Sequence, residues 1–509
     1  MKILYSNQLT ELSSEQQQCA YNGMDALMTY EIHDAIKSQA NVAYSYVMSF
    51  IPSILQMMTR GIKIDDAYKK LVIEGDPQAY DEKLRLGLKY RAFKLGGMVR
   101  KQLKRGGKWV VEDHNALIQD LAHVVWQKPL NYHSEKQLKA FFYDELRIPK
   151  IWQSKKGKST VTCGRDALEK IEKTYPRGAI FASIILRIRD LEKQVETLTQ
   201  DLSEDGRWIA SYNPSGTDTW RWSSSNNPLG HSANIQNINP ELRRAFVADP
   251  GYTFFNADQQ GAEARGVAYL SGDTNYIRAV ESGDVHTMVA SMVWGFEARR
   301  ELSDREFIRG FSYRDMCKKL AHGTAYGGMA RTLAQQASIE LGLVEEFQRL
   351  FFRNFPLIKK WQEYTIRQLQ VNGKLDTPFG FVRKFWGRLD DESTWRAAIA
   401  FRPQHIVGLM TAIGIRNLHA SYEPHVQVLA NGHDAVLGQI KNESVDYYMP
   451  LVLDCLSCPL EVKDIKGISR IMTIPWDAKI GHNWGDQELK DGQVVSNFDG
   501  LHKWKRLTS

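Results

Sequence analysis

The chain has 509 residues, too many for one compact core, so about three domains of ordinary size are expected. With 43% hydrophobic and 25% charged residues and a net charge of +7, the composition is that of a globular protein and excludes wholesale disorder. There is no run of about 18 apolar residues and no signal-peptide core, which excludes a membrane partner and predicts a cytoplasmic protein.

A basic segment lies early in the chain. Between Lys83 and Lys108 there are ten Lys or Arg residues and no Asp or Glu, with Tyr90 and Phe93 among them. Such a segment suits a polyanion, because each cation near a phosphate releases condensed counterions. A solvated surface face is the alternative, and both interpretations stay open.

The clearest helix is predicted over residues 184–202. Its apolar residues alternate at spacings of four and three, at Ile184, Ile188, Leu191, Val195, Leu198 and Leu202. This seam predicts packing against one antiparallel neighbour. Asp205 and Gly206 are expected to stop the helix, and short strands and a long loop rich in Gly, Pro, Ser and Asn follow.

Two aspartates lie where apolar strands are interrupted. Asp258 follows a strand predicted for residues 253–257, and Asp434 breaks two apolar runs in LANGHDAVLGQI. A lone buried carboxylate is costly, so Asp434 needs a charged partner. Two adjacent carboxylates repel unless divalent ions lie between them, and Mg²⁺ needs only one or two carboxylates plus substrate phosphates. The pair would suffice for two-metal phosphoryl transfer; two unrelated surface aspartates are the alternative.

The segment RDMCKKLAHGTAYGG carries a third group of polar residues. Arg314, Lys318, His322 and Tyr326 recur every four residues, which places them on one slowly winding helical face ended by two glycines. Cations can hold a triphosphate, and rings can stack on a sugar and base. A generic amphipathic helix would instead carry Leu or Val on this face.

These motifs together resemble family A (DNA polymerase I type) DNA polymerases. DQQGAEARGVAYLSGD resembles the first catalytic motif of the family, DYSQIELRxLAxxSGD, and the run from Arg314 to Gly327 resembles RxxxKxxxFGxxYG. GHDAV resembles the third motif, HDE, and TDTWRWSSSNNPLGHSANIQNI resembles TGRLSSxxPNLQNI. The resemblance runs in order from about residue 45 to residue 486, and AFRPQHIVG resembles phage members of the family.

The resemblance implies an α+β, right-hand polymerase fold with an antiparallel palm sheet and helical fingers and thumb. We expect four parts: a remnant of a 3′-5′ exonuclease domain at 1–45, the thumb at 46–205, the palm at 206–285 and 400–509, and the fingers at 286–399. The implied function is template-directed DNA synthesis on primer-template DNA with dNTPs, in phage replication and therefore in the host cell cytoplasm.

The resemblance also implies roles for single residues. Asp258 and Asp434 would bind two Mg²⁺ ions, Glu263 would be the steric gate against ribose, and Lys318 would also protonate pyrophosphate. Besides Glu263, the residues that would bind the nucleotide are Arg314, Lys318, His322 and Tyr326. Residues matched to primer, template or minor-groove contacts are Arg221, Gln236, Asn237, Gln404 and His433, and Arg265 would support the site.

Several positions depart from the family pattern. His322 stands where the family has Phe or Tyr, so the stacking on the incoming sugar is not carried over. Trp220 replaces a Gly and Trp222 a Leu. Ala435 stands where the family usually has a third acid, so two carboxylates would have to hold both ions.

Tyr21 and Asp25 resemble the last motif of the proofreading exonuclease, YxxxD. That chemistry needs at least three further carboxylates, which the twenty preceding residues do not supply. We therefore expect no exonuclease activity in this chain alone. A truncated chain and a split polymerase with a separate exonuclease polypeptide are both open explanations, and a processivity factor is a further possible partner.

Alternatives to a DNA polymerase are disfavoured by particular residues. A single-subunit RNA polymerase is disfavoured, because a glutamate at position 263 should reject ribose. A catalytically silent DNA-binding scaffold is disfavoured, because both aspartates and Lys318 are retained. Cys455 and Cys458 form a single CxxC with no second pair, so a structural role is favoured over a zinc site.

Overall fold

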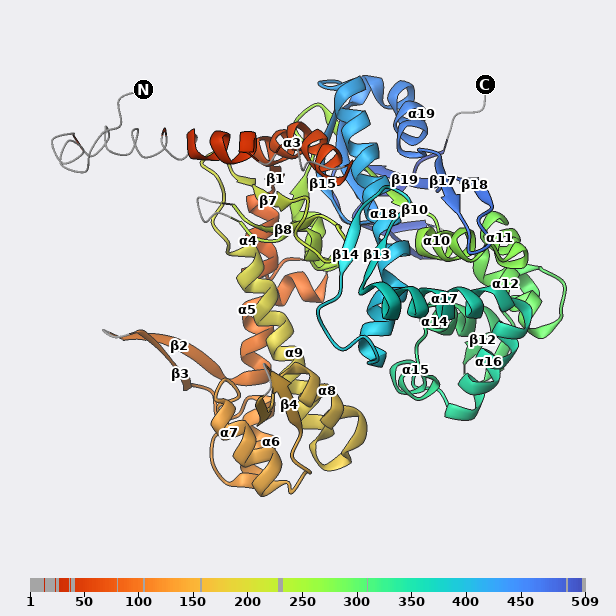
Figure 1. The fold of residues 1–509 in the computed structure, drawn as a ribbon. Coiled ribbons are helices and arrows are strands. Elements are labelled where there is room, and N and C mark those ends of the chain that lie inside the picture. The colour runs from red at the N-terminus through yellow and green to blue at the C-terminus, as the bar shows by residue number, and fades with distance from the viewer. Residues whose placement is uncertain are drawn as a thin grey trace.

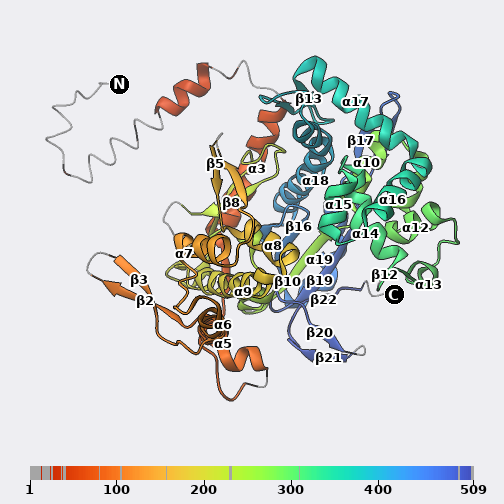
Figure 2. The same cartoon turned by 90° about the horizontal axis from the view of Figure 1, so that it is seen from below.

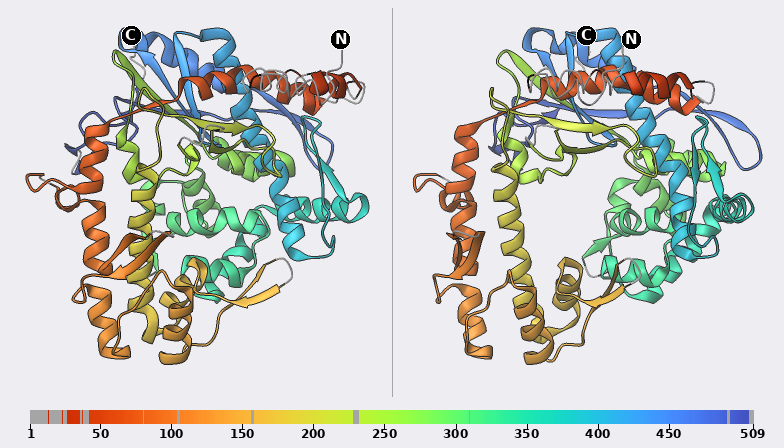
Figure 3. Two further views of the ribbon diagram at one scale, coloured as in Figure 1. Left: turned by 90° about the vertical axis from the view of Figure 1, so that its left-hand side faces the viewer. Right: turned by 60° about the vertical axis from the view of Figure 1, so that its left-hand side comes forward.

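The computed structural model describes residues 42–505 apart from 80, 104–105, 156–157, 228–231, 309 and 491–492, together with residues 13, 23, 27–35 and 37. A central antiparallel sheet carries two largely helical arms, which extend from it on opposite sides (Figures 1 and 3). The predicted α+β class is confirmed. Tyr21 and Asp25 lie outside the described residues.

The central sheet carries Asp258 on its open face. Its strands are, in spatial order, β15 (Val426–Asn431), β16 (Ala435–Lys441), β10 (Tyr252–Gln259), β19 (Trp476–Gly481) and β22 (His502–Lys503), and all neighbours are antiparallel. Along the central strand β10, Phe255 and Ala257 are buried while Asp258 between β16 and β19 is exposed. Side chains alternate across a strand, so Asp258 faces away from the packed side.

Helix α18 (Glu392–Tyr422) covers the packed side of the sheet. Gln259 at the end of β10 donates from Nε2 to the Thr411 hydroxyl of α18 at 3.1 Å. By length and composition α18 alone, among the residues described, could cross a membrane, but 83% of its apolar window is buried inside the protein. Burial in the core therefore accounts for its apolar character.

The first arm is built on two long antiparallel helices, α5 (Glu82–Gly96) and α9 (Pro176–Leu198), which lie side by side in Figure 1. Its outer part has its own buried core. The other elements of the arm are α4 (Asp66–Glu74), β2 (Met98–Leu103), β3 (Gly106–Val111), α6 (Leu117–Trp126), α7 (Glu135–Lys139), η2 (Ala140–Glu145), β4 (Trp152–Lys155), β5 (Lys158–Val161) and α8 (Arg165–Thr174). The basic segment forms α5 and the β2–β3 hairpin.

Helix α9 differs from the expected span of 184–202. It begins earlier, with Pro176 in its first turn, and ends at Leu198, so Leu202 lies outside it. The amide of Thr199 bonds the Val195 carbonyl and closes the last turn. Asp205 and Gly206 therefore do not stop the helix; they form the following turn, in which the Gly206 amide donates to the Ser203 carbonyl at 2.9 Å.

The second arm is mostly helical, as the pattern from residue 286 to 370 predicts. Figure 2 shows it across the sheet from α5 and α9. Its elements are α11 (Thr274–Glu281), α12 (Val285–Trp294), α13 (Arg300–Ser303), β11 (Glu306–Ile308), β12 (Phe311–Ser312), α14 (Tyr313–Ala325), α15 (Ala330–Ala337), α16 (Leu341–Asn354), α17 (Pro356–Asn372), β13 (Lys374–Asp376) and β14 (Val382–Lys384). Helix α11 packs on both α10 and α12 and so connects this arm to the elements beside the sheet.

The remaining elements surround the sheet. They are α3 (Val42–Arg60), β1 (Ile62–Ile64), β6 (Arg207–Trp208), β7 (Ala210–Asn213), β8 (Ser223–Asn226), η3 (Ile235–Asn237), η4 (Pro240–Ala245), β9 (Phe246–Val247), α10 (Ala262–Ser271), η5 (Asn442–Ser444), α19 (Val445–Leu456), β17 (Leu460–Lys463), β18 (Ser469–Met472), β20 (Glu488–Lys490) and β21 (Gln493–Ser496). Helix α3 packs against α18 and β15, which places it beside the sheet rather than in the first arm.

Candidate active site

The turn between β15 and β16 holds Asp434 beside β10. The Gly432 amide donates to the Ala435 carbonyl at 2.7 Å, and the His433 amide donates to Asn431 Oδ1 at 2.8 Å. His433 has a φ of 76°, a left-handed conformation that reverses the chain. The Gln259 amide then donates to the Asp434 carbonyl at 2.9 Å, which fastens the turn to the end of β10.

Asp258 and Asp434 line one cavity of about 200 Å³ together with Gln236. Desolvation by the surrounding protein and then the charge of Asp434 raise the pKa of Asp258 to about 6. The structure therefore brings the two predicted carboxylates close enough for their charges to interact. Hard carboxylate oxygens that repel each other across a small cavity fit a divalent cation.

The carboxylate pair belongs to no larger metal-ligating cluster among the residues described. Over the described part of the chain, no group of three or more His, Cys, Asp or Glu residues is arranged to hold a metal ion. Asp258 has Ala435 opposite it in β16 and Asp477 opposite it in β19. Ala435 thus occupies the neighbouring strand position on the β16 side, and its methyl group supplies no ligand there.

Glu263 lies at the centre of a hydrogen-bonded cluster. It is in the first turn of α10, which begins after Gly261 with a φ of 58°. The Tyr326 hydroxyl donates to Glu263 Oε2 at 2.7 Å, Arg221 Nη2 pairs with Oε1 at 2.5 Å, and His322 Nε2 lies 3.3 Å from Oε2. The sequence predicts separate roles for Glu263 and its three partners, and the structure places them in one cluster of polar contacts.

The cluster borders a second cavity of about 300 Å³, lined by Glu263, His322 and Asp434 among others. Burial and then the charge of Glu263 raise the pKa of Tyr326 well above its usual value, so its hydroxyl stays protonated and can donate to Glu263. Asp434 lines both cavities.

Helix α14 supplies two cations near this second cavity. Its start is fixed by Ser312 and Asp315, which cap each other's backbone amides. Arg314 lies 3.3 Å from Asp284, the N-cap residue of α12, and Lys318 one turn later is exposed. Tyr326 follows the helix end as its C-cap, and Gly327 has a φ of 74°.

His286 is a site residue that the sequence did not reveal. It lines the same cavity as Glu263, and burial and then the charge of Arg314 lower its pKa. Asp284, two residues earlier, is the N-cap residue of α12, a role that local sequence can suggest. Its ion pair with Arg314 joins α12 to α14, and local sequence does not predict such a contact. Only the packing of α12 against α14 brings these residues together.

Of the residues matched to DNA contacts, Gln236 lines the first cavity and Arg221 pairs with Glu263 at the second. Arg221 Nε donates to the Gln404 carbonyl at 3.2 Å, and Gln236 Nε2 donates to the Trp222 carbonyl at 3.0 Å. Asn237 is exposed at the end of η3. Burial and then the charge of Arg221 lower the pKa of His433. Its Nδ1 is buried and meets no hydrogen-bond partner among the residues described.

Arg265 lies behind the site and does not reach either cavity. It is 3% exposed, and its guanidinium pairs with Glu281 and donates to the carbonyls of Val280, Thr473 and Gln260. These bonds tie α10 to α11 and to the segment before β19. Its predicted supporting role thus corresponds to a structural contact.

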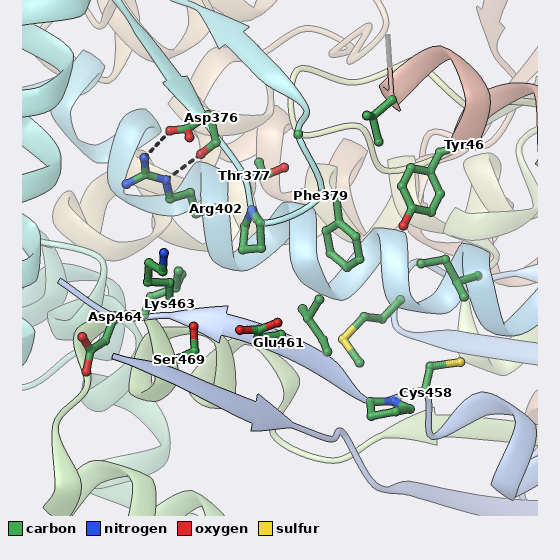
Figure 4. Close-up of a pocket in the computed structure, with 18 of the residues that line it drawn as sticks. Tyr46, Asp376, Thr377, Phe379, Arg402, Cys458, Glu461, Lys463, Asp464 and Ser469 are labelled. Atoms are coloured by element: carbon green, nitrogen blue, oxygen red, sulfur yellow. Dashed lines mark hydrogen bonds and ion pairs between the residues drawn. The ribbon is translucent and has the colours of Figure 1, made fainter. Parts of the chain in front are cut away.

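A larger cavity of about 970 Å³ lies away from these residues (Figure 4). It is bounded by the β13–β14 and β17–β18 hairpins and by α3, and it includes Arg402, which pairs with Asp376. Helix α18 contributes Arg402, Met410 and Arg416 to the lining of this cavity. Thr411 lies on another face of the helix and contacts β10. None of the predicted site residues lines it.

Comparison with known proteins identifies similar sequences. The model of the family described as DNA polymerase family A matches residues 100–486. The thermostable DNA polymerase I of Thermus aquaticus is 31% identical over 259 residues, which cover 50% of this chain and 29% of that protein. The DNA polymerase I of Chloroflexus aurantiacus is 29% identical over 398 residues, which cover 72% of this chain and 39% of that protein. The chain thus spans well under half the length of these relatives.

A solved structure has a similar fold. It is the POL domain of Pol1 from M. smegmatis in complex with DNA primer-template and dNTP, with a TM-score of 0.65 and 23% sequence identity. The match covers 86% of this chain and 69% of that chain. The likeness extends over the sheet and both arms, because it includes most of the residues described.

Proposed function

The chain belongs to DNA polymerase family A, and on that premise we propose that it extends a primer 3′-hydroxyl with deoxynucleotides directed by a template strand. The observation that carries the proposal is the position of Asp434, which lines one cavity with Asp258 and Gln236 and a second with Glu263 and His322. A carboxylate that lines two cavities can serve both an attacking and a leaving group.

The proposed chemistry is in-line transfer of the nucleotide α-phosphate. Asp258 and Asp434 would hold two Mg²⁺ ions, whose charge would favour loss of the primer hydroxyl proton to solvent and would stabilise the leaving pyrophosphate. Arg314 and Lys318 bind the triphosphate, and Lys318 gives a proton to the pyrophosphate. Most of the rate enhancement then comes from positioning and fixed charge.

The Glu263 cluster selects the sugar and supports the base pair. Glu263 fills the space where a ribose 2′-hydroxyl would lie, and Tyr326 and Arg221 hold its carboxylate in place. Tyr326 stacks near the templating base, and His322 borders the incoming sugar. Arg221, Gln236, Asn237, Gln404 and His433 contact the primer, template or minor groove.

The proposed division assigns the thumb to 46–205, the palm to 206–285 and 400–509, and the fingers to 286–399. Packing of α3 on the sheet favours moving α3 to the palm. The substrates are primer-template DNA and dNTPs, and the site of action is the cytoplasm where DNA is replicated. The phage context and the partner exonuclease remain predictions.

Primer extension with Mg²⁺ tests the function. Asp434→Ala should abolish extension of a matched primer while DNA binding persists, because it removes one of only two acidic ligands. Asp446→Ala, an exposed acid in the first turn of α19, is the matched control and should extend like the wild type. Equal extension by both variants, or none by the wild type, would refute the proposal and favour a silent scaffold.

A further inference from the structure

Arg243 is a charged residue in the candidate site for which the sequence suggests no role. It lies in η4 and lines the cavity that holds Gln236, Asp258 and Asp434. It also lines a neighbouring cavity of about 650 Å³ on the β19 side, with Asp258, Lys479 and Trp484. Arg243 therefore lies in the wall that separates these cavities, beside a proposed metal ligand.

The orientation of the guanidinium is fixed by a buried support. Arg243 Cζ lies 4.7 Å from the centre of the Trp484 ring, and Trp484 is 8% exposed. Trp484 Nε1 donates to Asn256 Oδ1 at 3.2 Å. Asn256 and Asp258 are on the same face of β10, because side chains alternate along a strand. The stack thus points the guanidinium at the open face that carries Asp258.

No ion pair among the described residues neutralises this guanidinium. Its Nε atom is buried and has no hydrogen-bond partner in the part of the chain that the structure describes. By contrast, Arg221 pairs with Glu263, Arg265 with Glu281, and on β19 Lys479 pairs with Asp486. Arginine has five N–H donors in a planar fork, so a supported but uncommitted guanidinium suits a planar or tetrahedral oxyanion.

The in-line geometry of phosphoryl transfer indicates which anion Arg243 would bind. Helix α14 borders the Glu263 cavity through Ala321, His322 and Ala325, Arg243 lines the other cavity, and Asp434 lines both. The attacking and leaving oxygens of phosphoryl transfer lie on opposite sides of the phosphorus. If the triphosphate occupies the α14 side, the primer end must approach from the side of Arg243.

On this basis, and resting on the proposed function, we infer that Arg243, supported by Trp484, binds a backbone phosphate among the last linkages of the primer strand. The contact orients the 3′-terminal nucleotide beside Asp258. Arg243 is thereby a primer-binding and positioning residue. Burial in the wall of the cavity limits solvent screening of the contact, which strengthens a charged hydrogen bond.

The test measures DNA affinity rather than turnover. Primers in which each of the three linkages nearest the 3′ end is replaced in turn by an uncharged methylphosphonate are bound to wild type and Arg243→Gln, and dissociation constants are measured by fluorescence anisotropy over a salt series. One neutral linkage should weaken wild-type binding about tenfold, because a charged hydrogen bond is lost. In Arg243→Gln, neutralising the same linkage should not weaken binding further. The slope of log affinity against log salt concentration should decrease in magnitude by about one.

Matched variants separate binding from folding. Arg244→Gln removes a guanidinium that lies 4.7 Å from the Tyr68 ring, outside both cavities, and should retain the wild-type response. Arg243→Lys keeps the charge and should recover most of the salt slope. If Arg243→Gln still discriminates against the neutral linkage, or loses turnover with unchanged affinity, the inference is wrong. Because binding is measured without extension, failure of this inference is distinguishable from failure of the proposed polymerase activity.

Discussion

Single side chains in this protein are held by several partners at once. Glu263 receives bonds from Tyr326 and Arg221 and contacts His322, so the orientation of its carboxylate is fixed. His405 is enclosed by Phe379, Phe381 and Phe401, and its Nδ1 is joined to the Thr219 carbonyl at 3.1 Å. These two environments lead to separate predictions.

Glu263→Ala should raise the incorporation of ribonucleotides relative to deoxynucleotides by about tenfold or more, because the side chain that excludes the 2′-hydroxyl is gone. Competitive single-nucleotide extension measures the ratio. Glu263→Gln keeps the volume and loses the charge, so it should retain most of the selectivity. If the glutamine variant loses as much selectivity as the alanine variant, exclusion depends on charge rather than on volume.

His405 makes stability depend on pH. Burial lowers its pKa to about 4 from an ordinary value near 6.5, so the unfolded chain binds the proton first as pH falls. Its contribution is fully present above about pH 6.5 and is lost between about pH 6.5 and 4, at up to ~1.4 kcal/mol per pH unit. Urea unfolding across this range should show a flatter profile for His405→Gln. His419→Gln, on the same helix, should keep the wild-type slope.

At the scale of elements, the junction between α4 and α5 depends on close backbone contact. Gly87 has a φ of 66° and interrupts the helical geometry of α5. A Cβ at this position would lie 2.4 Å from the Gly75 amide nitrogen, and Gly75 itself has a φ of 85°. The two glycines thus allow the chain before α5 to cross the helix, which sets the direction of the first arm.

Gly87→Ala should destabilise the protein more than Gly206→Ala. Both residues have positive φ, which costs an L-residue about 1–2 kcal/mol. A Cβ added at Gly206 would enter open space with no neighbouring atom within 4 Å, whereas one added at Gly87 would meet backbone that cannot move aside. Chemical denaturation measures the difference. Equal losses in the two variants would show that the contact with Gly75 is unimportant.

At the scale of the molecule, two hydrophobic cores are joined by α9. One core lies in the outer part of the first arm and includes Phe141, Phe142 and Leu168. The other extends through the sheet, α18 and the second arm. Because each core is contiguous and the arm projects from the sheet (Figure 3), the outer part can open without disrupting the candidate site.

Phe142→Ala should remove hydrogen-exchange protection from the outer part of the first arm while β10 and β16 keep theirs. The side chain is fully buried, and truncation of such a phenylalanine costs about 3–5 kcal/mol. Phe347→Ala, buried in the other core, is the matched control and should leave α6 and α8 protected. Loss of protection throughout the molecule in Phe142→Ala would indicate a single cooperative unit.

Much of the site follows from local sequence. An apolar strand followed by Asp258, and two apolar runs around Asp434, predict carboxylates at strand ends, and the structure has them there. The four-residue spacing of Arg314, Lys318 and His322 predicts their shared helix. The end of α9 could not be predicted, because Leu202 continues the apolar spacing although the helix ends at Leu198.

The sequence by itself determined which groups are candidates for the chemistry, because ordered motifs and hydrophobic periodicity are properties of neighbouring residues. It could not determine that Arg314 pairs with Asp284, that Arg221, His322 and Tyr326 meet at Glu263, or that Arg243 stacks on Trp484 beside Asp258. These contacts join residues far apart in the chain. Only the packing of α12 on α14, of α10 on α18 and of β10 between β16 and β19 brings them within bonding distance.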